Sequence, residues 1–237
     1  MKLTLALAAF GAASVTTGLV AAQPPDTSYT APNYSTPREE PVGTKALPAP
    51  SNALEITAAT GYTQGFGSLK GGLGMPSVAT AGLGLDLGVG YRADPHWAVL
   101  WAGQYQEFTA ERTAAARGFS TSLAAQYHFV PSRPVDPWIE GGAGYRFLWE
   151  NPSLGPTILS HGIQLGRVRG GVDFRADKNV AFGPMVGADA TMFLFQDAPN
   201  LGTAIDEPRL STFVYAGVQG RFDVGGNETP TRTVSKR

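Results

Sequence analysis

The strongest constraint in this sequence is an alternation of apolar and polar residues with a period of two, in segments of about ten residues. The clearest segment runs from 83 to 92, where one set of alternate positions is apolar and the other carries glycines, Asp86 and Arg92. Successive side chains of a β-strand point to opposite faces. The pattern therefore predicts a strand with one apolar and one polar face.

Seven further segments carry the same alternation. The regular ones lie at 119–129, 167–175 and 214–222, and the looser ones lie at 53–67, 97–108, 137–149 and 180–195. Charged residues make up only 16% of the chain, against about 25% in an ordinary soluble domain. Together these features predict an all-β fold, an eight-stranded antiparallel up-and-down transmembrane β-barrel.

The connections between the segments support this topology. Short connections lie at 93–96, 131–136 and 177–179, and longer ones at 68–80, 109–118, 150–162 and 196–210. The two kinds alternate along the chain, as expected for short periplasmic turns and longer outer loops. An even number of strands then places both chain ends in the periplasm.

Aromatic residues gather at both ends of the predicted strands. Those near the periplasmic ends are Tyr91, Trp97, Tyr127, Phe129, Phe174, Phe182 and Phe222, and those toward the outer ends are Tyr62, Tyr105, Phe119, Phe147 and Trp149. Two such bands, one strand length apart, are typical of the aromatic girdles at the two membrane interfaces.

The chain begins with a pattern typical of export. Residues 1–22 have a basic start, an apolar run and a small-residue cleavage site after Ala22, which predicts a signal peptide; the alternative is a permanent membrane anchor. Residues 23–52 form a predicted Pro-rich disordered periplasmic linker, 53–225 the barrel and 226–237 a polar C-terminal tail. The expected location is the outer membrane of a Gram-negative-type bacterium.

From 53 to 224 the chain resembles the small eight-stranded outer-membrane proteins of the OmpA transmembrane-domain or OmpW type. The resemblance rests on architecture, without a diagnostic motif. It implies a last-strand signal for the barrel-assembly machinery, matched here by Tyr215, Gly217 and Phe222. Gly220 departs from the apolar residue expected in that signal, which leaves the subfamily open.

The inward faces of the predicted strands carry five acids and six bases. They are Glu55, Asp86, Glu140, Asp173 and Asp189, with Arg92, Arg146, Arg167, Arg169, Arg175 and Arg221. Charges buried in so narrow a lumen must be paired. Strand register places Asp189 near Arg167 and Arg169, and barrel closure places Glu55 near Arg221. The first interpretation is a charge network that closes the lumen, and the second is a constricted polar path.

No motif indicates catalysis, and no cofactor or metal ion is expected. Cysteine is absent, and the histidines His96, His128 and His161 are far apart in the sequence. His128 is predicted to face inward as a satisfied lumen histidine, and His161 to be solvated in an outer loop. The acids of the last outer loop, Asp197, Asp206 and Glu207, are interpreted as solvated.

Three functions are compatible with these features. The first is a structural or interaction barrel, the second a narrow channel for small polar or amphipathic solutes, and the third a lipid-modifying envelope enzyme. The absence of a catalytic motif favours a protein that is not an enzyme. Expected partners are outer-membrane lipid, the barrel-assembly machinery and a small-molecule or protein ligand at the outer loops. The net charge of -1 argues against a nucleic-acid partner. The protein is expected to be a monomer.

Overall fold

The computed structural model describes residues 48–109, 113–199 and 201–227. These belong to the second of two units, Thr44–Arg237; the first is Met1–Gly43. The predicted signal peptide, most of the predicted linker and most of the tail lie outside the described residues. Within the described ranges, no helix is both long and apolar enough to cross a membrane.

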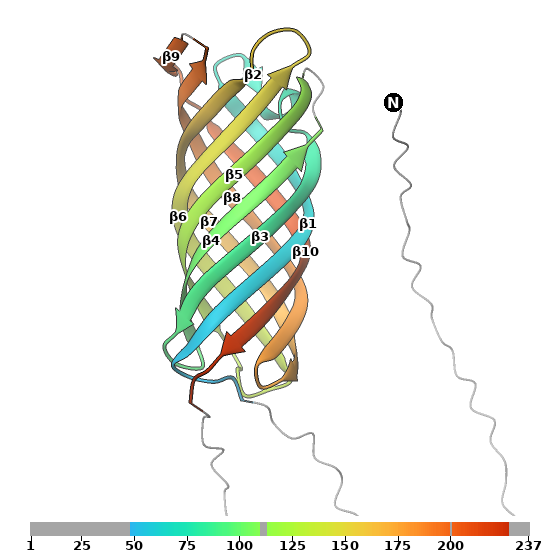
Figure 1. The fold of residues 1–237 in the computed structure, drawn as a ribbon, viewed down its shortest axis with the longest axis vertical. Helices are drawn as coiled ribbons and strands as arrows, with labels where there is room; N and C mark the ends of the chain where they lie inside the picture. The colour runs from blue at the N-terminus through green and yellow to red at the C-terminus, as the bar shows by residue number, and fades with distance from the viewer. Residues whose placement is uncertain (1–47, 110–112, 200, 228–237) are drawn as a thin grey trace, which may run out of the picture. The chain divides into compact units, whose positions relative to one another are not determined.

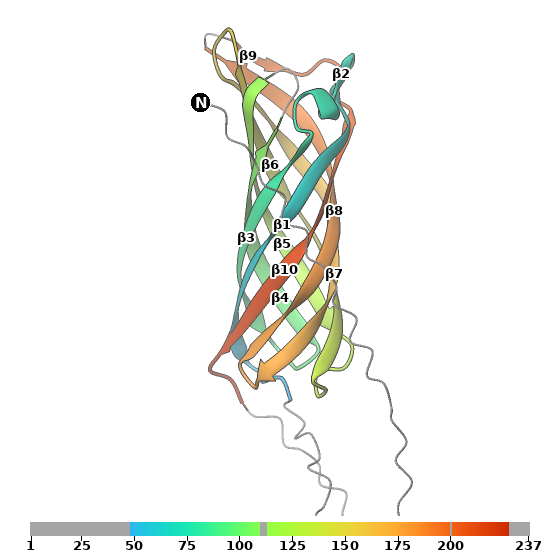
Figure 2. The ribbon, with the colours of Figure 1, turned by 90° about the vertical axis from the view of Figure 1, so that its right-hand side faces the viewer.

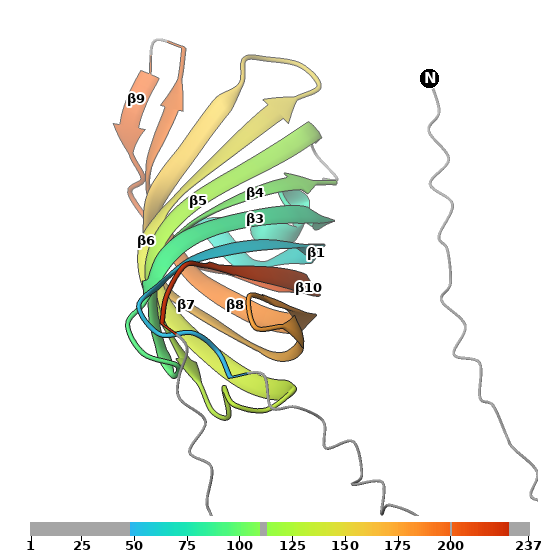
Figure 3. The same cartoon turned by 60° about the horizontal axis from the view of Figure 1, so that its bottom comes forward.

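In the described residues, eight long antiparallel strands form a closed barrel (Figures 1 and 3). They are β1 (Ala53–Lys70), β3 (Ala81–Arg92), β4 (Trp97–Phe108), β5 (Thr113–His128), β6 (Val135–Pro152), β7 (Ile158–Asp177), β8 (Val180–Ala198) and β10 (Leu210–Val224). Each strand pairs with the next along the chain, and β10 pairs with both β8 and β1. The predicted eight-stranded antiparallel barrel is therefore confirmed.

The period-two pattern determines which side chains face outward. Along β1, Leu54 and Ile56 are exposed on the outside, whereas Glu55 and Thr57 are buried in the lumen. Leu83 of β3 is 69% exposed. This is the reverse of a water-soluble protein, in which aliphatic side chains are buried, and it gives the wall a continuous apolar outer surface.

Three short elements lie at the outer end of the barrel (Figure 2). They are β2 (Leu73–Gly74), the 3-10 turn η1 (Met75–Ser77) and β9 (Leu201–Ala204). The segment holding β2 and η1 folds back over the barrel, so that Met75 and Val78 are buried. This segment thus contributes buried apolar side chains at the outer end of the barrel.

Two of the four predicted outer loops are mainly strand. Residues 113–118 belong to β5, and β6 and β7 extend through Pro152 and from Ile158. The sequence places these boundaries wrongly because the alternation weakens where inward positions become apolar, as at Ala116 and Leu148. The loops at 71–80 and 199–209 are the longer connections.

The end of the predicted linker packs against the periplasmic end of the barrel. The Ala49 amide donates to the carbonyl oxygen of Pro131 at 3.0 Å, and Ala49 and Pro50 are buried. Ser51 pairs with Asn227 of the predicted tail. The barrel unit therefore includes these few residues on either side of the predicted limits 53 and 225.

Gly183 and Gly141 provide a matched test of wall packing. A Cβ atom at Gly183 would overlap the carbonyl oxygen of Val172 on β7, whereas one at Gly141 would have no heavy atom within 4 Å. We expect Gly183→Ala to lower the free energy of unfolding by about 1–3 kcal/mol, and Gly141→Ala to leave it unchanged or raise it slightly. Urea unfolding from vesicles measures both, and equal effects would contradict the packing described.

Candidate functional site

The lumen gathers all eleven charged residues predicted to face inward. Each is buried, with at most 6% of its surface exposed. Asp136, Glu150 and Asp223, which were not predicted to face inward, are also buried, and His128 is fully buried beside Asp136. The candidate site is therefore a stack of polar layers along the barrel axis.

The periplasmic cluster is the layer nearest the short turns. It comprises Glu55, Arg92, His128, Asp136, Asp173, Arg175, Arg221 and Asp223. Arg92 forms ion pairs with Glu55 at 2.7 Å and with Asp223 at 3.3 Å. Arg221 pairs with Glu55 at 2.9 Å and also contacts Asp173. The structure thus brings Glu55 and Arg221 together, as the register predicted.

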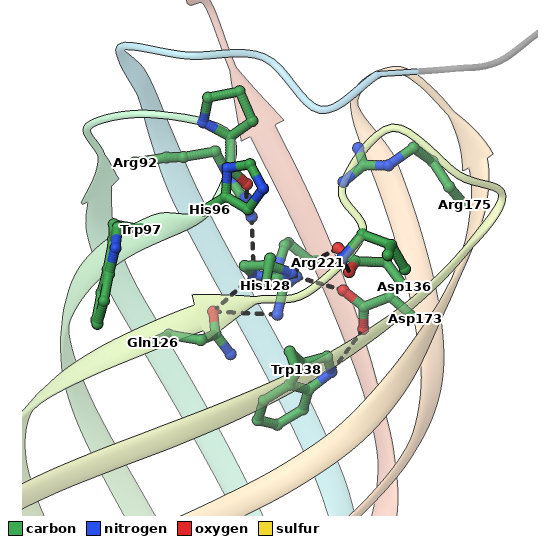
Figure 4. Close-up of polar contacts among 12 residues, drawn as sticks. Arg92, His96, Trp97, Gln126, His128, Asp136, Trp138, Asp173, Arg175 and Arg221 are labelled. Atoms are coloured by element: carbon green, nitrogen blue, oxygen red, sulfur yellow. Dashed lines mark hydrogen bonds and ion pairs between the residues drawn. The ribbon is translucent and has the colours of Figure 1, made fainter.

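His128 lies at the centre of this cluster (Figure 4). Its Nδ1 is 2.7 Å from Asp136 Oδ2, and its Nε2 is 2.9 Å from Arg221 Nη1. Because a guanidinium can only donate, Nε2 accepts and the ring proton lies on Nδ1, directed at Asp136. Asp136 is held in turn by the Val130 amide at 2.9 Å. These contacts occupy both ring nitrogens of His128.

The central quartet lies deeper in the lumen and consists of Asp86, Glu140, Arg167 and Arg169. Arg169 binds Glu140 through two hydrogen bonds of 2.8 and 2.5 Å and reaches Asp86 at 3.0 Å. Arg167 binds Asp86 at 2.5 Å. Two cations and two anions therefore link β7 to β3 across the lumen, and the Arg169–Glu140 pair is bidentate, the strongest form of an arginine–carboxylate contact.

One predicted pair forms differently. Asp189 lies opposite Arg167 in the β7–β8 register, as predicted, but its carboxylate binds Arg146 of β6 at 2.5 Å. Tyr215 donates to the other carboxylate oxygen at 3.1 Å. The long arginine side chains reach past their strand neighbours, so register alone does not decide the ion pairs.

An apolar cluster fills the lumen beyond Arg146, toward the outer end. It contains Leu69, Met75, Val78, Ala79, Phe108, Ala116, Leu148, Phe193, Ile205 and Phe213. The Phe213 ring contacts the Arg146 guanidinium, with 4.0 Å from the carbon to the ring centroid. This cluster was not predicted, because large apolar residues of a membrane barrel are expected on the outer face.

The three residues of the predicted assembly signal do not share one face. Tyr215 is buried in the lumen, Gly217 packs directly against Gly61 of β1, and Phe222 is 45% exposed on the outside. Inside the lumen, the Tyr215 hydroxyl donates a hydrogen bond to Asp189.

The lumen is close to electrically neutral and has no arrangement for metal binding or nucleophilic catalysis in the described part of the chain. Six buried arginines face eight buried carboxylates, which are the five predicted ones with Asp136, Glu150 and Asp223. No group of three or more His, Cys, Asp or Glu in these residues could hold a metal ion, and no hydroxyl side chain among them is hydrogen-bonded to His128.

Comparison with known proteins supports the fold. No family model matches the chain, and no curated protein matches it. Among solved structures, the chain has the fold of the small outer-membrane β-barrels. Neisserial surface protein A is similar over 70% of this chain and 95% of its own, with 16% identity and a TM-score of 0.51. OprG from Pseudomonas aeruginosa covers 74% of this chain and 98% of its own, with 13% identity and a TM-score of 0.47.

Proposed function

We propose that this protein is an outer-membrane barrel with a structural or interaction role and a closed lumen. The observation that carries the proposal is the stack of buried layers: the periplasmic cluster, the central quartet, the Arg146–Asp189 pair and the apolar cluster. A hydrated ion would have to separate paired charges and then cross a dry constriction. The role is proposed to be non-enzymatic.

The outer surface supports placement in a membrane. On β4–β8, one register row near the outer end holds Tyr105, Phe119, Phe147, His161 and Phe195, and the next row outward holds Glu107, Arg117, Trp149, Leu159 and Asp197. Along the outer wall, an aliphatic surface is thus followed by a row of aromatic rings and then by a row that carries charged residues. This order is expected where a barrel crosses from the bilayer into its interface. Exposed Tyr91, Trp97 and Phe129 mark the opposite end.

Export and assembly belong to the same proposal. Cleavage after Ala22 and recognition of Tyr215, Gly217 and Phe222 by the assembly machinery would deliver the barrel to the outer membrane, where a monomer of the OmpA or OmpW type fits the architecture. We expect the purified protein to migrate faster on gels when unheated than when boiled, and to remain in the washed membrane fraction. Recovery in the periplasmic extract, without a heat shift, would refute membrane placement.

The second candidate is a narrow channel for small polar or amphipathic solutes, and unpaired lumen atoms are the observation in its favour. The side-chain amide nitrogen and carbonyl oxygen of both Gln164 and Gln219 are buried without a hydrogen-bond partner. Such groups are often satisfied by ordered water. Liposome swelling in small sugars tests this candidate. We expect no swelling with the wild type; swelling comparable to that with an open porin would favour the channel.

A further inference from the structure

Three polar side chains form a hydrogen-bonded chain on the outside of the wall, near its outer end. Tyr145 Oη lies 2.7 Å from His161 Nδ1, and His161 Nε2 lies 3.2 Å from Asp197 Oδ2. With the tyrosine donating to Nδ1, the neutral imidazole carries its proton on Nε2 and donates to the carboxylate. The prediction that His161 is solvated in an outer loop is wrong, because it lies within β7.

Aromatic rings surround this chain. The His161 ring centroid is 5.9 Å from that of Phe147 and 5.4 Å from that of Phe195, and the ring planes lie within 26° of parallel. The His161 side chain is 21% exposed and that of Asp197 is 51% exposed. We call Tyr145, Phe147, His161, Phe195 and Asp197 the outer-wall patch; it presents both ring surface and a carboxylate outside the barrel.

The position of the outer-wall patch indicates what it meets. Exposed Ile163 and Leu165 continue from it along β7 into the aliphatic surface, and Arg117 and Trp149 lie in the charged row beyond it. On the proposed membrane placement, the patch is therefore level with lipid headgroups. At this level the polar groups of the patch face lipid headgroups, whereas Ile163 and Leu165 face acyl chains.

We propose that the outer-wall patch binds the sugar headgroup of a glycolipid, an inference that rests on the proposed membrane function. Phe195, at the edge of the stacked rings, is 44% exposed, and the electron-rich face of an aromatic ring attracts the weakly positive C–H groups of a sugar ring. The Asp197 carboxylate only accepts hydrogen bonds, so it favours hydroxyl groups over phosphate. The acyl chains of the same lipid would then run along Ile163 and Leu165.

The test uses the full-length protein reconstituted in vesicles of phosphatidylethanolamine and phosphatidylglycerol that contain a minor share of digalactosyl diacylglycerol. After extraction in mild detergent and purification, mass spectrometry measures the lipids that remain bound. We expect the galactolipid to be enriched over phosphatidylglycerol relative to the vesicles. His161→Phe keeps a ring and removes the hydrogen bonds, and Asp197→Asn removes the charge; each should lower the enrichment by about fivefold.

Asp206→Asn is the matched control, because Asp206 is an outer-loop acid outside the patch, and it should retain the wild-type enrichment. Absence of enrichment in the wild type, or unchanged enrichment in both patch variants, would overturn the inference. The gel heat shift is recorded for every sample. A protein that inserts without enriching the galactolipid contradicts only the sugar site, whereas a protein that fails to insert contradicts the proposed function itself.

Discussion

Replacing Glu140 with leucine should lower the free energy of unfolding by about 3–5 kcal/mol, because it leaves buried Arg169 without its bidentate partner. Arg167, whose Nε lies 3.6 Å from Glu140, would lose a neighbouring anion as well. Asp86 would then be the only carboxylate of the central quartet, facing both Arg167 and Arg169. Urea unfolding from vesicles, followed by tryptophan fluorescence, measures the loss.

The matched control for Glu140→Leu is Glu107→Gln. Glu107 lies 3.6 Å from Arg117 on the outside of the wall, and both side chains are more than half exposed. An exposed pair contributes about 0.2–1 kcal/mol, so this variant should unfold nearly as the wild type does. Adding Arg169→Met to Glu140→Leu should recover part of the lost stability, since it removes the unpaired cation. Equal losses for Glu140→Leu and Glu107→Gln would contradict the central quartet as described.

Replacing Phe213 with alanine should also lower the free energy of unfolding by about 3–5 kcal/mol. The Phe213 ring is fully buried, contacts Phe108 and Phe193, and covers the Arg146 guanidinium. Its removal would leave a cavity that the rigid wall cannot close. The same unfolding measurement detects the loss.

Phe174→Ala is the control for the apolar cluster. Phe174 is 44% exposed on the outside of the wall, where lipid or detergent can occupy the vacated space. We therefore expect a clearly smaller loss of stability than for Phe213→Ala. If the two variants lost the same stability, Phe213 would not be the packed centre of the outer lumen.

The fold was predictable because the alternation repeats in every strand and connection lengths alternate with it. The limits of β4, Trp97–Phe108, agree with the sequence prediction to the residue. Continuing the same alternation by one step would also have placed Asp223 and Phe213 inside, since both share the parity of Arg221. They were missed because the predicted regular segment began at Val214 and ended at Phe222, two apolar residues that were assigned to the outer face.

The pairing inside the lumen was less predictable. Glu55 and Arg221 lie on neighbouring strands, so register brings them together. Arg167 reaches Asp86 across the barrel, from β7 to β3. That contact depends on strand tilt and stagger, which set the heights at which opposite walls face each other, and neither quantity can be read from alternation. The hydrogen-bonded chain through His161 escaped prediction because its strand begins earlier than the pattern indicates.

The most direct test of the closed lumen is the electrical conductance of the refolded wild-type protein in a planar lipid bilayer. Insertion is verified independently by the gel heat shift of the same sample. The paired layers and the apolar cluster predict a quiet baseline at every applied voltage. Steady single-channel steps of reproducible size, from protein shown to be inserted, would contradict the closed lumen and establish a conducting path.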